Sequence, residues 1–153
     1  MTDYENHDAL GLAALVRRGE VTPGELLDAM LERQARDNPR LNAVVTPLHD
    51  AARAQIAAGL PDGPFCGVPF LVKELVASVK GCPTTFASRL YANNMPAADS
   101  EVVARMRRSG LVIAASGLDP APTLPIPTPT VRTPLPQRAF LPIVARGGLG
   151  RCP

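Results

Sequence analysis

The chain has 153 residues, of which 46% are hydrophobic and 20% are charged, and its formal net charge at pH 7 is +2. This composition excludes a wholly disordered chain, and the length is sufficient for one ordinary domain with a buried core. The charge neither favours nor excludes a nucleic-acid partner, and no apolar run approaches membrane-spanning length. The cysteines (Cys66, Cys82 and Cys152) are odd in number and far apart. Their spacing argues against a disulfide framework or a zinc site and favours free thiols in a reducing cytoplasm.

The first two predicted elements are helices. Asp8 is a typical capping residue, and the pattern that follows predicts a helix to about Arg18, ended by Gly19. Residues 22–25 (TPGE) combine a capping box with a proline at the first helical position. They predict the start of a second helix, which we expect to end at Asn38-Pro39. The apolar stripes of both helices are interpreted as core packing.

A short strand and a third helix are predicted next, at residues 43–46 and 49–58. His49 and Asp50 are adjacent, so their side chains point apart on a helix, and we interpret His49 as a solvated surface residue. The only other histidine, His7, lies near the N-terminus. A histidine metal site and a Ser-His-Asp triad therefore have little support in this sequence.

The most informative stretch is residues 67–74 (GVPFLVKE). Its apolar triplet predicts a short buried strand, entered through a glycine and a proline, with Lys73 at its end. The residues alone leave two interpretations of Lys73 open. Its stem lies on apolar surface while the amine reaches water or pairs with Glu74, or the amine is desolvated toward neutrality and acts as a catalytic base.

A loop, a helix and a strand complete the predicted domain. Residues 77–98 contain glycine, prolines and small hydroxyl residues with little periodicity, which is typical of a functional loop. Asp99 is predicted to cap a helix closed by Gly110, and residues 111–115 predict a second buried strand. Three apolar residues of this helix are expected to face inward: Val102, Val103 and Met106. The alternation of helices and strands predicts an α/β fold with a mixed, partly parallel sheet covered on both faces.

Residues 118–153 differ from the rest of the chain in composition. They hold nine of the 17 prolines and four of the 16 basic residues, but only one of the 14 acidic residues. Proline removes a backbone donor and is excluded from helix interiors and central strands, so this segment cannot continue the sheet. We expect a disordered or polyproline-type tail.

Four motifs occur in the chain in this order: residues 38–45 (NPRLNAVV), 67–74 (GVPFLVKE), 81–89 (GCPTTFASR) and 99–103 (DSEVV). Together they resemble the amidase-signature family, whose enzymes hydrolyse carboxylic amides with a Ser–cis-Ser–Lys triad. The resemblance implies that residues 1–117 are the N-terminal portion of an amidase domain and that Lys73 is the catalytic base. It implies a small-molecule amide substrate and no metal or organic cofactor.

The resemblance stops near residue 116. The family's next segment supplies the bridging serine and the oxyanion-hole amides, and a nucleophilic serine follows, whereas residues 118–153 contain no serine. The serines that remain as substitutes are Ser78, Ser88, Ser100, Ser109 and Ser116. We therefore expect an incomplete amidase fold, truncated or frameshifted near residues 114–118, with little or no activity of its own.

Two other functions stay open. A non-catalytic interaction or complementation protein would use an exposed sheet edge and apolar helix faces to self-associate or to bind a complementary fragment. A relative of the catalytic subunit of tRNA-dependent amidotransferases is ranked lower, because the sequence has no basic helix or aromatic-interleaved patch for a nucleic acid. The polar, acidic N-terminus (residues 1–5, MTDYE) does not resemble a secretory signal, so we expect a cytoplasmic protein without a membrane partner.

Overall fold

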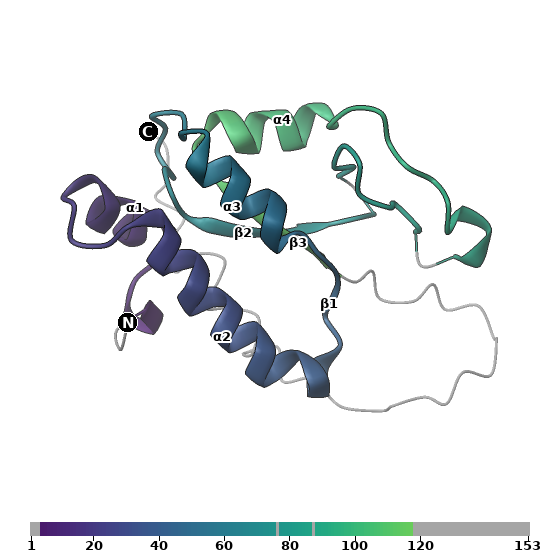
Figure 1. Cartoon of the computed structure of the whole chain (residues 1–153), viewed down its shortest axis with the longest axis horizontal. Helices are drawn as coiled ribbons and strands as arrows, with labels where there is room; N and C mark the ends of the chain where they lie inside the picture. The colour runs from purple at the N-terminus through teal and green to yellow at the C-terminus, as the bar shows by residue number, and fades with distance from the viewer. Residues whose placement is uncertain (1–3, 76, 87, 118–153) are drawn as a thin grey trace, which may run out of the picture.

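A computed structural model describes residues 4–75, 77–86 and 88–117 (Figure 1). The α-helices are α1 (Ala9–Arg17), α2 (Pro23–Leu41), α3 (His49–Ala57) and α4 (Glu101–Arg108). The strands are β1 (Val44–Pro47), β2 (Pro69–Lys73) and β3 (Val112–Gly117), and two 3₁₀ turns are η1 (Tyr4–Asn6) and η2 (Arg89–Tyr91). The proline-rich segment 118–153 and Cys152 lie outside the described residues, so the boundary at residue 117 and the disordered or frameshifted tail stay predictions. None of the described helices is both long and apolar enough to cross a membrane.

The described strands form one mixed sheet in the order β1-β3-β2. The central strand, β3, is parallel to β2 and antiparallel to β1. Its last residue, Gly117, lies opposite Lys73 of β2 on one side and opposite Val44 of β1 on the other. This arrangement confirms the predicted α/β fold with a partly parallel sheet.

Helices cover both faces of this sheet. Successive side chains of β3 point to opposite sides, and each set is buried against different helices. On one face, α2 and α3 pack against β3, and α3 passes in front of the sheet in Figure 1. The buried residues of this layer are Leu27, Met30, Ala52, Val112 and Ala114. On the other face, α4 and the chain after β2 bury Val72, Ala77, Val79, Cys82, Val103 and Ile113. The helix α1 packs beside the start of α2 in a third cluster.

Both predicted helix starts are confirmed. The Asp8 carboxylate accepts a hydrogen bond from the backbone N–H of Gly11 at 2.7 Å. In α2, the backbone N–H of Thr22 donates to the Glu25 carboxylate at 2.8 Å, and the backbone N–H of Glu25 donates to the Thr22 hydroxyl at 3.2 Å. The capping box therefore satisfies two of the N–H groups that have no partner within the helix.

The end of α2 differs from the prediction. The helix continues through Pro39 to Leu41 and stops at Asn42, whose φ of 48° is in the left-handed region. A proline in the last turn removes one hydrogen bond, and the Asn38 side chain makes two others there. Its amide group accepts from the backbone N–H of Val44 at 2.9 Å and donates to the Val44 carbonyl at 3.0 Å, which ties the helix to the first residue of β1.

The start of α4 also differs. Ser100, not Asp99, is the capping residue, and the helix begins at Glu101. Val103 and the half-buried Met106 are three residues apart and share the inward face of the helix. Val102 is 41% exposed, so its predicted inward orientation is wrong.

Candidate active site

Lys73 is the last residue of β2, at the edge of the sheet where the carboxyl ends of β2 and β3 meet. The preceding side chain, Val72, is buried in the core, but the Lys73 side chain is exposed. The Lys73 side chain therefore does not have, among the described residues, the burial that a desolvated amine requires. The catalytic role of Lys73 stays a prediction.

The residue after Lys73 is a buried acid. Glu74 is 5% exposed, and its carboxylate accepts a hydrogen bond from the Thr85 hydroxyl at 2.6 Å. A buried carboxylate is costly unless hydrogen bonds replace its hydration, so this contact helps to hold residue 85 at the end of β2. From the sequence we considered Glu74 only as a partner for Lys73. The signal that could have pointed to this contact was the pair of threonines at residues 84 and 85 in the following loop.

The predicted loop after β2 contains two segments that run side by side, residues 78–84 and 94–100, which we call the paired arms. Four hydrogen bonds cross between them: Ser100 N–Ser78 O (2.9 Å), Lys80 N–Asp99 Oδ1 (2.7 Å), Gly81 N–Pro96 O (3.1 Å) and Thr84 N–Asn94 O (3.0 Å). The Asn94 side chain also donates to the Thr84 carbonyl at 2.9 Å. The arms thus form an irregular ladder whose far end lies next to Thr85.

The five serines considered as substitute nucleophiles are spread over the fold. Ser116 lies in β3 opposite Val72, one position before the pair formed by Gly117 and Lys73, and it is buried. The Ser88 hydroxyl accepts from the backbone N–H of Leu90, and the Ser109 hydroxyl donates to the Met106 carbonyl. Ser78 and Ser100 lie together at the base of the paired arms. By strand register, Ser116 is level with Val72, so its side chain lies on the opposite face of the sheet from that of Lys73.

No group of three or more histidine, cysteine, aspartate or glutamate side chains suited to a metal ion occurs in the described ranges. His49 is half-buried, with its Nε2 atom 3.2 Å from Nε2 of Gln34, so the interpretation as a solvated surface histidine is wrong. Cys66 and Cys82 are free thiols. Burial raises the pKa of the Cys82 thiol, and the nearby Glu74 carboxylate raises it further, which makes this residue a poor nucleophile.

The chain is similar in sequence to amidases and to an amidotransferase subunit. A family model described as Amidase matches residues 25–117. A glutamyl-tRNA(Gln) amidotransferase subunit from Salinispora arenicola is 42% identical over 123 residues, which cover 74% of this chain and 24% of that protein. Acylamidase of Rhodococcus erythropolis is 38% identical over 119 residues, which cover 72% of this chain and 25% of that protein. The chain therefore spans about a quarter of the length of these relatives.

Solved structures share the fold. The structure of 6-aminohexanoate cyclic dimer hydrolase matches with a TM-score of 0.71 at 34% identity, over 78% of this chain and 24% of that one. A bacterial aryl acylamidase described as an amidase-signature enzyme matches with a TM-score of 0.69 at 28% identity, over 75% of this chain and 26% of that one. The chain belongs to the amidase-signature family.

Proposed function

We propose that this chain provides the lysine-bearing part of an amide-hydrolysing site, with Lys73 as the general base, and that it turns over substrate only together with further amidase-family structure. The observation that carries this proposal is the place of Lys73 at the carboxyl end of a parallel strand, within residues 67–74. In open α/β sheets, ligands bind outside the carboxyl ends of the strands. The exposed Lys73 side chain is accessible to a substrate there.

The chemistry expected of such a site is acyl transfer. A serine hydroxyl attacks the amide carbonyl while its proton passes through the bridging serine to the lysine amine. The carbon–nitrogen bond breaks as the leaving amine is protonated, and water then hydrolyses the acyl-enzyme. Oxyanion donors are needed to stabilise the tetrahedral intermediate. A base without an aligned nucleophile and these donors lowers the barrier very little, so we expect the isolated chain to be inactive.

A chimera tests this proposal. Residues 1–117 would replace the matching N-terminal part of the Rhodococcus erythropolis acylamidase, and release of the amine product would be followed. We expect amide hydrolysis by the chimera, none by the isolated chain, and a loss of about 10²- to 10⁴-fold in kcat on Lys73→Ala, the range for a missing general base.

The matched control is Lys80→Ala, which removes the only other lysine of the chain and should leave kcat unchanged. A chimera that folds, as judged by a cooperative thermal transition, but does not hydrolyse amides would contradict the proposal. Equal activity of the Lys73→Ala and Lys80→Ala chimeras would contradict it as well.

Exposed apolar side chains favour a second function, the binding of the remaining portion of an amidase-family domain. Four such residues lie after β2 and along the following loop: Leu75, Leu90, Tyr91 and Met95. Leu90 is 84% exposed. Large apolar side chains exposed to solvent are candidates for an interaction surface, and the relatives have about three quarters of their length beyond the matched region.

We expect a separately produced remainder of the Rhodococcus erythropolis acylamidase to co-elute with this chain in size-exclusion chromatography, and Leu90→Asp to weaken that association. The control is Leu10→Asp, at an exposed position on α1, away in sequence from these four residues. Equal effects of the two variants would contradict this second function. Self-association of the chain alone would indicate homo-oligomerisation instead.

A role in tRNA-dependent amidation has less support. The arginines of α4 are ion-paired, Arg105 and Arg108 with Glu101, and Arg107 with Asp99. Helix α4 therefore offers little uncompensated charge to a nucleic acid.

A further inference from the structure

We propose that Arg107 is a positioning residue for the Lys73 site, acting through Asp99 and the paired arms on the contact between Thr85 and Glu74. This inference rests on the proposed function for its catalytic consequence, but its structural part stands on the contacts of Arg107 itself. Arg107 lies on α4, and its side chain is one-third exposed.

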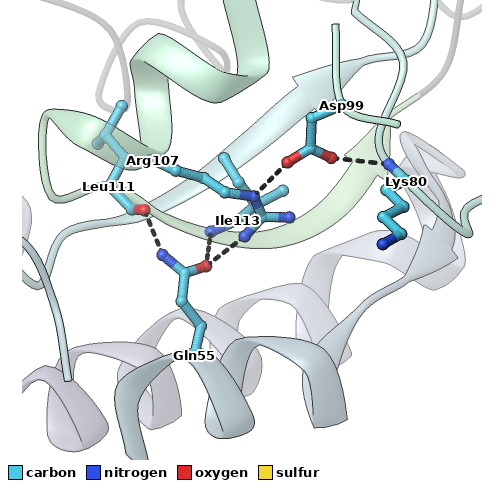
Figure 2. Close-up of polar contacts among 6 residues, drawn as sticks. All are labelled: Gln55, Lys80, Asp99, Arg107, Leu111 and Ile113. Carbon is cyan, nitrogen blue, oxygen red and sulfur yellow. Dashed lines mark hydrogen bonds and ion pairs between the residues drawn. The ribbon is translucent and has the colours of Figure 1, made fainter. Parts of the chain in front are cut away.

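The guanidinium of Arg107 joins two elements that are distant in sequence (Figure 2). Its Nε donates to Asp99 Oδ2 at 2.8 Å, and its Nη1 donates to Gln55 Oε1 of α3 at 2.7 Å. The two acceptors are on different side chains, so the fork of a guanidinium is needed to reach both. Lysine has a single nitrogen and cannot reproduce this geometry.

Gln55 connects this group to the sheet. Its Nε2 donates to the Leu111 carbonyl at 2.8 Å, and its Oε1 also accepts from the backbone N–H of Ile113 at 3.4 Å. Strand β1 pairs with β3 only from Ala115 onward, so the Gln55 amide satisfies the β3 edge where β1 does not reach. Arg107 is therefore connected through Gln55 to the backbone at the start of the central strand.

Asp99 connects Arg107 to the paired arms. Its second oxygen, Oδ1, accepts from the backbone N–H of Lys80, so one carboxylate bonds both Arg107 and the opposite arm (Figure 2). Asp99 is 20% exposed, where charge-assisted hydrogen bonds are stronger than at an open surface. This explains why Asp99 does not cap α4: both carboxylate oxygens are engaged elsewhere.

Hydrogen bonds connect the far end of the paired arms to the residue beside Lys73. Thr84 and Asn94 are paired by two hydrogen bonds, and the next residue, Thr85, bonds Glu74 beside Lys73. Phe86 follows with a φ of 49°, which is unfavourable for a bulky side chain. A strained backbone persists only where its surroundings hold it, and the Phe86 ring packs edge-on against the Tyr91 ring, with the ring centroids 5.6 Å apart.

The test is hydrogen exchange of the full chain with Arg107→Gln, with kcat of the chimera as the second readout. We expect exchange of the amides at residues 80, 81, 84 and 100 to rise at least about tenfold, while the Val112 amide in the core changes little. In the chimera, kcat should fall about tenfold or more, because small misplacements of a catalytic group are costly. Arg107→Lys should not restore either value.

The matched control is Arg105→Gln, on the same helix, whose side chain pairs only with Glu101 in the described structure. An increase in exchange that is uniform across the protein, or equal to that of the control, would overturn the inference. An active chimera whose kcat is unaffected by Arg107→Gln would overturn it too. A chimera that is inactive before this substitution contradicts the proposed function instead, and the exchange result then decides this inference alone.

Discussion

Replacing Gly110 by alanine is expected to destabilise the domain by about 2–5 kcal/mol. Gly110 follows α4 with a φ of +89°, a region that L side chains rarely adopt. A Cβ atom there would lie 2.6 Å from Cα and 2.8 Å from the backbone nitrogen of Cys66. Conformational strain of about 1–2 kcal/mol adds to an overpacking cost of about 1–3 kcal/mol. The free energy of unfolding, measured by urea titration with circular dichroism, gives the cost directly.

Gly59→Ala provides the control that separates these two costs. Its φ of +91° is nearly that of Gly110, but no atom lies within 4 Å of the position of a Cβ. We expect it to cost only the conformational part, about 1 kcal/mol. Equal destabilisation by both substitutions would show that the segment carrying Cys66 does not pack against Gly110, and with it that the entry into β2 is misplaced.

The sequence predicted those features of the fold that depend on neighbouring residues. Thr22 and Glu25 are three residues apart and form a capping box in any helix that begins there. The strand ending at Lys73 was likewise evident from three consecutive apolar residues. The end of α2 was wrong because it depends on the Asn38 amide, which bonds a residue of the next strand.

The contacts around the candidate site could not be predicted in the same way, because they join residues that only the tertiary structure brings together. Gln55 and Arg107 are 52 residues apart in the chain, and the Thr85 hydroxyl meets the Glu74 carboxylate across the start of an irregular loop. Local preference makes Asp99 a helix cap, whereas tertiary hydrogen bonds direct its carboxylate to Lys80 and Arg107. The resemblance identified Lys73, but not the contacts that surround it.

Leu27→Ala is expected to cost about 2–5 kcal/mol of the free energy of unfolding, the range for a leucine deleted from a packed core. Leu27 is fully buried between α2, α3 and the face of β3 that carries Val112 and Ala114. Because domains of this size are stable by about 5–15 kcal/mol, the loss is a large fraction of the total.

Leu10→Ala is the matched control, since Leu10 is 55% exposed on α1, and surface substitutions usually cost less than about 0.5 kcal/mol. Both variants should unfold in one transition with an unchanged dependence on urea concentration. This comparison decides whether the described residues form a core by themselves. If Leu27→Ala were as mild as Leu10→Ala, α2 would not be packed on the sheet in solution, and β2 could not hold Lys73 at a defined place until further amidase-family structure joined it.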